Sequence, residues 1–225
     1  MQKKKSSRVR DPFDYYPTPS WCVHRLLESG VLPSTKNVWL EPSAGDGNII
    51  QAVSSFEKIE NDNVIRFKPS WVAYEIQPRF SSFLEEKMPL SQIHIDNFLD
   101  LGSRHTLGVV PNVILGNPPY SHALEFVKKS MKLGADYICF LLRLSFLGSS
   151  ERSTFMRQCM PDVYILPNRP SFSNKGTDTS EYGWFLWKRQ EGGSYENPKG
   201  QIQILNNTPK EIRNPKSITS NLQAE

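Results

Sequence analysis

Short apolar runs alternate with polar, helix-length segments along most of the chain. Runs at residues 37–40, 113–116 and 136–142 are too short for helices and have the composition of buried strands. The segments between such runs, for example residues 79–88 and 123–133, are typical of amphipathic helices. This alternation predicts an α/β fold built on a doubly wound, mostly parallel sheet.

The two ends of the chain differ from this pattern. Residues 1–10 are basic, and residues 189–225 are rich in Asn, Pro, Gly, Lys and Gln, with only residues 202–205 suited to a short strand. We expect one domain over residues 11–188 and a mobile C-terminal tail, because the tail has too little apolar surface to offset the entropy of ordering. Near the end of the domain, V-Y-I-L-P and E-Y-G-W-F-L-W predict an antiparallel strand pair.

The first expected helix begins near Pro19. Thr18 and Ser20 are both candidate caps for it. Its apolar stripe comprises Trp21, Val23, Leu26 and Leu27.

The most informative stretch is V-I-L-G-N-P-P-Y at residues 113–120. Two consecutive prolines must end the strand, and ligands of open α/β sheets bind at the carboxyl ends of strands. The rigid turn presents the Asn117 side-chain oxygen and the Pro118 carbonyl as acceptors beside the ring of Tyr120. Such a turn suits a planar ring that carries an exocyclic amino group. A strand terminator without chemistry is the alternative.

Three further signals follow other expected strands. Glu41 precedes a small-residue loop with Gly45 and Gly47, where glycine lets the backbone approach a ligand closely. Glu75 ends the next strand, where a carboxylate can accept hydrogen bonds from both hydroxyls of a ribose. Asp96 follows a third strand. Each signal alone is compatible with a tight turn or a solvated acid, but their order fits a doubly wound sheet.

Together these motifs resemble the class I S-adenosylmethionine-dependent amino-methyltransferases, whose motif is Asp, Asn or Ser followed by Pro-Pro and an aromatic residue. Their order is similar to that of small phage and bacterial DNA adenine-N6 methyltransferases. The resemblance covers about residues 11–188 and implies a seven-stranded, Rossmann-like sheet with S-adenosyl-L-methionine as cofactor. The implied catalytic residues are Asn117, Pro118, Pro119 and Tyr120. The implied cofactor contacts are Tyr16, Pro17, Thr18, Pro19, Glu41, Pro42, Ser43, Ala44, Gly45, Gly47, Glu75, Ile76, Asp96, Asn97 and Phe98.

The R-P-S-F segment also resembles these enzymes, and it implies that Phe172 holds a flipped base. Packing of Phe172 in the core is the alternative. No large separate target-recognition domain is expected, unlike in restriction-associated relatives.

Charge adds a candidate nucleic-acid contact. The net charge is only +4, but the basic arm gathers Lys3, Lys4, Lys5, Arg8 and Arg10 without an acid. The arm is either a solvated segment or a binder of phosphate backbone, and both interpretations stay open.

The rest of the composition indicates the cellular location and the state of the cysteines. No apolar run approaches a membrane span, and the N-terminus lacks the apolar core of a secretory signal, so a cytoplasmic protein is expected. Three scattered cysteines and four scattered histidines have no metal-site spacing, so we expect reduced thiols and no metal. We expect a monomer.

The predicted function is methyl transfer from S-adenosyl-L-methionine to the N6 amino group of adenine in DNA, on a flipped or single-stranded base. A base in RNA or a glutamine amide in a protein is an alternative, because the motif recognises a planar amine or amide rather than a polymer. A non-catalytic nucleic-acid-binding relative is a further alternative, which the intact motifs disfavour.

Overall fold

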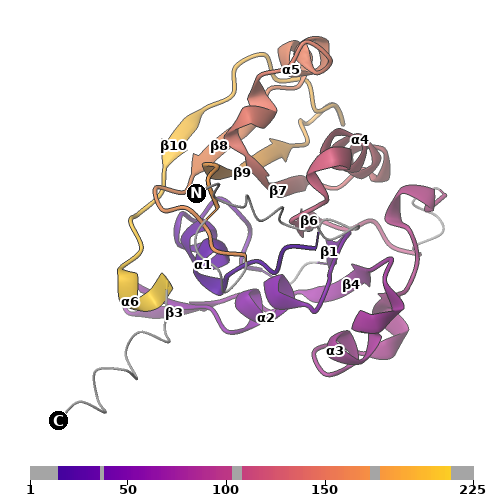
Figure 1. The fold of residues 1–225 in the computed structure, drawn as a ribbon, viewed down its shortest axis with the longest axis vertical. Helices are drawn as coiled ribbons and strands as arrows, with labels where there is room; N and C mark the ends of the chain where they lie inside the picture. Colours follow the sequence, from indigo (N-terminus) through magenta and orange to yellow (C-terminus); the bar gives the residue numbers. More distant parts are fainter. Residues whose placement is uncertain (1–14, 36–37, 103–107, 173–177, 214–225) are drawn as a thin grey trace, which may run out of the picture.

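The computed structural model describes residues 15–35, 38–102, 108–172 and 178–213. An eight-stranded sheet in the order β10-β8-β9-β7-β6-β1-β4-β5 runs through the molecule (Figure 1). Its strands are β1 (Val38–Glu41), β4 (Ser70–Tyr74), β5 (Ile93–His94), β6 (Val113–Gly116), β7 (Tyr137–Arg143), β8 (Asp162–Ile165), β9 (Tyr182–Lys188) and β10 (Ile202–Ile204). Neighbouring strands are parallel except at β9, which runs antiparallel to both β7 and β8. The predicted α/β class and the antiparallel C-terminal pair are confirmed.

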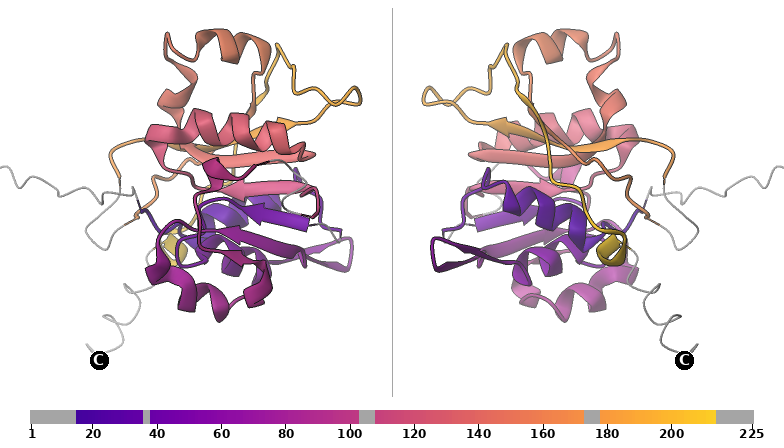
Figure 2. Two further views of the ribbon diagram at one scale, coloured as in Figure 1. Left: turned by 90° about the vertical axis from the view of Figure 1, so that its right-hand side faces the viewer. Right: turned by 90° about the vertical axis from the view of Figure 1, so that its left-hand side faces the viewer.

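Helices lie on both faces of this sheet (Figures 1 and 2). One face packs against α1 (Ser20–Glu28) and α2 (Asn48–Ser54), and the other against α4 (Ala123–Leu133) and α5 (Ser153–Gln158). The remaining helical segments are η1 (Pro78–Phe80), α3 (Ser81–Glu85), η2 (Leu90–Gln92), η3 (Phe98–Asp100), η5 (Tyr120–His122), η6 (Leu144–Leu147) and α6 (Lys210–Arg213). The expected helix over residues 79–88 is therefore shorter and begins as a 3₁₀ turn.

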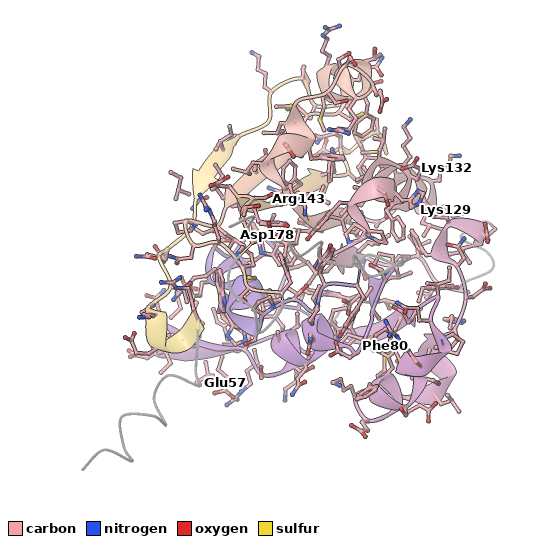
Figure 3. All side chains as sticks on the ribbon, in the orientation of Figure 1. Glu57, Phe80, Lys129, Lys132, Arg143 and Asp178 are labelled. Atoms are coloured by element: carbon pink, nitrogen blue, oxygen red, sulfur yellow. The ribbon has the colours of Figure 1, made fainter. Side chains whose placement is uncertain are left out.

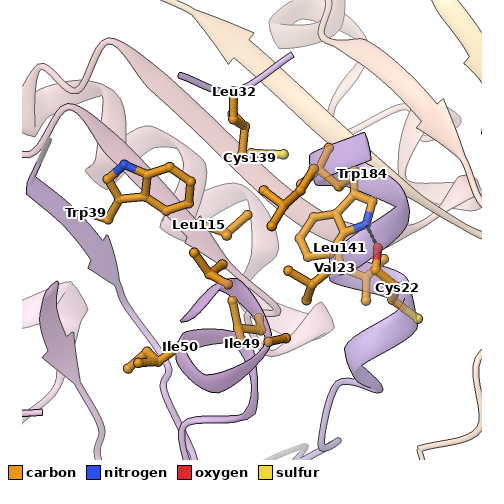
Figure 4. Close-up of a cluster of buried hydrophobic side chains, with 14 of the residues drawn as sticks. Cys22, Val23, Leu32, Trp39, Ile49, Ile50, Leu115, Cys139, Leu141 and Trp184 are labelled. Carbon is orange, nitrogen blue, oxygen red and sulfur yellow. Dashed lines mark hydrogen bonds between the residues drawn. The ribbon is translucent and has the colours of Figure 1, made fainter. Parts of the chain in front are cut away.

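The core divides into two clusters because successive strand residues point to opposite faces. In β6, Val113 and Leu115 join the cluster beneath α1 and α2, whereas Ile114 joins the cluster beneath α4. Figure 4 shows the first cluster, in which the indole nitrogen of Trp184 donates to the backbone carbonyl of Cys22 at 2.9 Å. That bond ties β9 to α1, so the N-terminal segment is anchored to the far half of the sheet.

The prediction that Thr18 or Ser20 caps the first helix is wrong. The four residues of its apolar stripe are buried as predicted, but Pro19 occupies the N-cap position and no side chain caps α1. Proline fixes its own φ, which is −60° here, but it has no polar side-chain atom that could accept a hydrogen bond from the first turn of the helix. The Thr18 hydroxyl instead accepts a hydrogen bond from Asn117.

The polar connection after α2 contains a β-hairpin that the sequence did not predict. Strands β2 (Glu57–Glu60) and β3 (Asn63–Arg66) pair antiparallel. Asn61 and Asp62 form the two-residue turn with φ of 48° and 60°, a conformation that Asn and Asp tolerate well. The hairpin is exposed because its strands are mostly polar.

The described part of the polar C-terminal segment packs on the domain. β10 pairs with β8 and gives the sheet its eighth strand. Thr208 is buried, and its Oγ1 accepts a hydrogen bond from Arg25 Nε of α1 at 2.9 Å. β10 falls within the short strand expected at residues 202–205, while the predicted domain end at residue 188 and the mobility of the tail stay predictions. The predicted mobility of residues 214–225 concerns a segment outside the described residues.

Candidate active site

A cavity of about 320 Å³ lies at the carboxyl ends of β1, β4, β5 and β6. This is the sheet edge at which ligands of open α/β sheets bind. The sequence-predicted residues that line it are Tyr16, Pro17, Thr18, Glu41, Pro42, Ser43, Ala44, Gly45, Glu75, Ile76, Asp96, Asn97, Phe98, Asn117 and Pro119. The fold therefore brings together five motifs that are spread over about a hundred residues of sequence.

Some predicted residues lie beside the cavity without lining it. Pro19 and Gly47 are the N-cap residues of α1 and α2, and Pro118 is buried in the turn. Tyr120 lines an adjoining cavity. The predicted contacts Lys3, Lys4, Lys5, Arg8 and Arg10 fall outside the described residues.

Sequence reasoning also missed residues that line the cavity. These are Tyr15, Asp46, Asn48, Ile49, Leu99, Ser121, His122 and Phe126. Most of them are direct neighbours of a recognised motif, so widening each motif by one or two residues would have found them. Phe126 belongs to α4, and nothing in its sequence neighbourhood points to the cavity.

The side-chain amide of Asn117 is held in one orientation. Its Nδ2 donates to the backbone carbonyl of Tyr16 and to Thr18 Oγ1, both at 3.1 Å. Because a carbonyl can only accept, these contacts fix which amide atom is nitrogen. Asn117 Oδ1 is then a buried acceptor without a hydrogen-bond donor among the described residues. Such an unsatisfied atom costs about 1–3 kcal/mol, which a ligand amino group would offset.

The carboxylate of Glu75 joins the end of β4 to the glycine loop that follows β1. Glu75 Oε2 accepts the backbone N–H of Gly45 at 2.7 Å, and Oε1 accepts the N–H of Gln77 at 2.8 Å. Each oxygen retains a further lone pair for a ligand hydroxyl. Burial raises the pKa of Glu75, although the two backbone bonds oppose this shift.

Gly45 is required by the conformation of this loop. Its φ is +53°, and a Cβ placed there would lie 2.8 Å from Cε2 of the Tyr15 ring. Glycine avoids both the left-handed strain and the clash. The loop backbone can therefore sit closely beneath Tyr15 at the cavity wall.

The cavity is acidic. Burial raises the pKa of Glu41 well above its usual range, and the nearby charges of Asp46 and Glu75 raise it further. Glu41 Oε2 is buried and has no hydrogen-bond partner among the described residues. No Lys or Arg of the described chain lines this cavity. The site therefore favours a ligand that brings positive charge and amino hydrogens.

The ring of Tyr120 is contacted by an aromatic ring and by a guanidinium group. The ring of Tyr16 stacks on it at 5.7 Å with an interplanar angle of 17°, and the Arg143 guanidinium lies 4.8 Å from its centroid. Burial raises the pKa of Tyr120, so its hydroxyl is neutral. A base that stacks on Tyr120 has to share or displace one of these neighbours.

Phe172 has the contacts of a core residue. It is buried, and its ring packs edge-on against Tyr182, with 5.1 Å between centroids, and in a tilted arrangement against Tyr16, with 5.7 Å between centroids. Its contact with Tyr16 links it indirectly to the Asn117 turn. These contacts favour the packing alternative over direct contact with a base, which stays untested.

The described residues contain neither a metal-type cluster of side chains nor a helix suited to a membrane. No group of His, Cys, Asp and Glu side chains there has an arrangement that could hold a metal ion. No helix in the described ranges is both long and apolar enough to cross a membrane.

Comparisons with known proteins identify the fold. No protein-family model and no curated protein matches the chain. Among solved structures, a protein from Listeria monocytogenes described as a class I S-adenosylmethionine-dependent methyltransferase aligns with a TM-score of 0.57 and 13% identity, over 89% of this chain and 68% of that chain.

Two further solved structures are similar to a comparable degree. The methyltransferase subunit of a type I restriction-modification system from Streptococcus thermophilus aligns with a TM-score of 0.56 and 13% identity, over 93% of this chain and 53% of that one. The 23S rRNA methyltransferase ErmE aligns with a TM-score of 0.53 and 14% identity, over 92% and 78% of the two chains. This chain thus spans about half the length of the restriction-modification subunit. It has the fold of class I S-adenosylmethionine-dependent methyltransferases.

Proposed function

We propose that this protein transfers a methyl group from S-adenosyl-L-methionine to the N6 amino group of adenine in DNA. The observation that carries the proposal is Asn117 Oδ1, a buried acceptor that lacks a donor and whose amide nitrogen is already engaged. An adenine amino group supplies the missing hydrogen. Asn117 therefore contacts the substrate in this proposal and does not serve the turn alone.

The acidic cavity fits S-adenosyl-L-methionine. This cofactor carries an ammonium group and a sulfonium against one carboxylate, so it is a net cation. Glu41 and Glu75 are the carboxylates that would favour a cation, and Glu75 retains lone pairs for ribose hydroxyls. Asp96 and Phe98 line the same cavity and would hold the adenine ring of the cofactor. A volume of about 320 Å³ lies within the usual range of small-molecule sites.

The residues of the turn act on the amino group that receives the methyl. When bound, the cofactor supplies an electrophilic methyl group whose bonding electrons stay on sulfur. The adenine nitrogen is a weak nucleophile because its lone pair is delocalised into the ring. Asn117 Oδ1 and the Pro118 carbonyl accept its hydrogens, which favours a tetrahedral nitrogen as positive charge develops. The nitrogen then loses one proton to solvent.

DNA is preferred among the polymers that bear such an amino group. The motif order and the R-P-S-F segment resemble DNA adenine methyltransferases, and one similar structure is a subunit of a restriction-modification system. The basic arm, with Lys3, Lys4, Lys5, Arg8 and Arg10, is proposed to follow the phosphate backbone.

A product assay tests the proposal. The full chain is incubated with labelled S-adenosyl-L-methionine and with separate DNA, RNA and protein pools, and the products are hydrolysed and identified by mass spectrometry. We expect N6-methyladenine from DNA. Methylated RNA bases or methylglutamine without methylated DNA would refute the assignment of DNA, and no product from any pool would refute the proposed reaction.

A further inference from the structure

A second cavity, of about 290 Å³, adjoins the first on the far side of the N-P-P-Y turn. The two cavities share Tyr16 and Ser121, so the turn lies between them. Residues that line the second cavity are Tyr16, Tyr120, Ser121, Ala123, Leu142, Arg143, Ser145, Phe146 and Arg152. It lies at the carboxyl end of β7 and beside η6.

The two cavities have opposite charge. The described lining of the first includes Glu41, Asp46, Glu75 and Asp96 and no basic side chain other than His122. The described lining of the second includes two arginines and no acid. A cation is favoured on one side of the turn and an anion on the other.

Arg143 is held at the second cavity by polar contacts. Its Nε donates to Tyr182 Oη at 3.1 Å, and its Nη2 lies 3.7 Å from Asp178 Oδ2 (Figure 3 labels both charged residues). An ion pair of this length leaves guanidinium hydrogens available for a closer anion. About a third of the Arg143 side chain is exposed.

Arg152 brings a second positive charge that no described carboxylate pairs with. Its Nε donates to the Phe146 carbonyl at 2.9 Å, and its guanidinium lies 4.8 Å from the Phe146 ring centroid. Neutral carbonyls orient the group but do not cancel its charge. Oriented arginines around a small cavity are suited to a phosphate.

We propose that the second cavity binds a backbone phosphate of the nucleic-acid strand through Arg143 and Arg152, while the target base lies between Tyr120 and Asn117. This inference rests on the proposed function and narrows its substrate. A protein glutamine side chain brings no anion to this cavity, so the two arginines favour a nucleotide over an amide. As Arg143 turns from Asp178 to the phosphate, it uncovers part of the Tyr120 ring.

Binding of a short, fluorescein-labelled, adenine-containing oligonucleotide tests the inference. Anisotropy is measured over a range of salt concentrations with S-adenosylhomocysteine present, so that no methyl transfer occurs. Arg143→Gln and Arg152→Gln should each weaken binding about tenfold, the value of one charge-assisted contact. Each should also lower the log–log salt slope by about one. Arg66→Gln is the matched control, since Arg66 is also ion-paired, at 2.6 Å to Glu57, but lies on the remote hairpin.

A second variant should change oligonucleotide affinity in the opposite direction. Asp178→Asn keeps an acceptor for Tyr182 but removes the charge that competes for Arg143, so oligonucleotide binding should tighten several-fold. Asp162→Asn is its control. Asp162 and Asp178 are 17% and 18% exposed, and each pairs with a cation, at 3.4 and 3.7 Å. Asp162 pairs with Lys188 at the opposite end of the sheet's strands, so its replacement should have little effect.

The outcomes separate this inference from the proposed reaction. If folded Arg143→Gln and Arg152→Gln bind like wild type with unchanged salt slopes, the phosphate site is refuted, even when wild type methylates DNA. If the salt slopes of Arg143→Gln and Arg152→Gln both fall while that of Arg66→Gln equals the wild-type slope, the phosphate site is supported, even when the methylated atom is another amino group. Equal tightening by Asp178→Asn and Asp162→Asn would refute the exchange of partners by Arg143.

Discussion

The side-chain nitrogen of Asn117 donates to the backbone carbonyl of Tyr16, although the two residues are 101 positions apart. This bond connects the N-terminal segment to the central turn of the sheet. It also determines that Asn117 presents its oxygen, not its nitrogen, for a substrate amino group.

Thr18 is predicted to support that orientation. Thr18→Val removes the second acceptor of the Asn117 amide and buries an unsatisfied N–H, so single-turnover methyl transfer should fall about tenfold. Thr18→Ser retains the oxygen and should restore most of the rate. Comparing the two variants controls for shape changes in the cavity wall. Equal rates for Val, Ser and wild type would show that the hydroxyl does not orient Asn117.

Gly45→Ala is predicted to weaken cofactor binding. The substitution adds left-handed strain at φ +53° and a contact of 2.8 Å with Tyr15. Calorimetric affinity for S-adenosyl-L-methionine should drop by about tenfold, because a loss of ~1.4 kcal/mol has that effect. Gly192→Ala is the control, since a Cβ there meets nothing within 4 Å. The double variant Gly45→Ala, Tyr15→Ala should recover part of the loss; unchanged affinity in folded Gly45→Ala would contradict the role of this loop.

Glu41 is predicted to make stability fall as pH rises. Burial keeps the pKa of Glu41 in the folded state above its pKa in the unfolded state. The contribution of Glu41 to the free energy of unfolding is therefore complete below the unfolded pKa and is lost as pH rises through the folded pKa. Without ligand, Glu41→Gln should therefore gain thermal stability relative to wild type as pH rises above about 4.5, the ordinary pKa of a Glu side chain. Glu57→Gln should show no such gain, because its hydrogen bond to Arg66 lowers the pKa of Glu57. If the stability difference between Glu41→Gln and wild type stays constant as pH rises, the raised pKa of Glu41 is contradicted.

Bound cofactor should reverse that trend. Positive charge near Glu41 favours its ionised form, so binding should release protons and tighten as pH rises. Calorimetry in buffers of different ionisation enthalpy measures the proton count. The Glu41→Gln variant should release fewer protons than wild type.

The fold could be predicted from sequence because its strands are distinct apolar runs. Val113–Gly116 is buried throughout, and its only plausible packing is inside a sheet covered on both faces. β10 was harder to assign because Ile202 and Ile204 are exposed, and its position depends on pairing with β8. The hairpin turn at Asn61 and Asp62 has recognisable turn residues, but its strands lack an apolar face.

The site could be predicted in part. Residues at strand ends, such as Glu41, Glu75 and Asn117, follow from topology alone. Topology does not determine which of their polar atoms are left for a ligand. Tyr16 and Gly45, which lie far away in the sequence, already hydrogen-bond to the side chains of Asn117 and Glu75. The surroundings of Tyr120 were not predictable either, since Arg143 reaches its ring from β7.

The basic arm is predicted to act through phosphate contacts. Deleting residues 1–10 removes Lys3, Lys4, Lys5, Arg8 and Arg10 and should weaken DNA binding while flattening its dependence on salt. Cofactor affinity should not change. A salt slope identical to that of the full chain would make the arm a bystander.

The role of Asn117 as acceptor for the substrate amino group is tested by the single-turnover rate of methyl transfer to adenine-containing DNA in Asn117→Ala. The variant removes the unsatisfied acceptor but keeps both prolines and the glycine loop. The rate should fall at least about a hundredfold with unchanged cofactor affinity, as for loss of one preorganised transition-state hydrogen bond. Asn112→Ala, at the other end of β6, should retain the wild-type rate. A wild-type rate in Asn117→Ala would contradict a catalytic role of Asn117 and leave N-P-P-Y as a strand terminator.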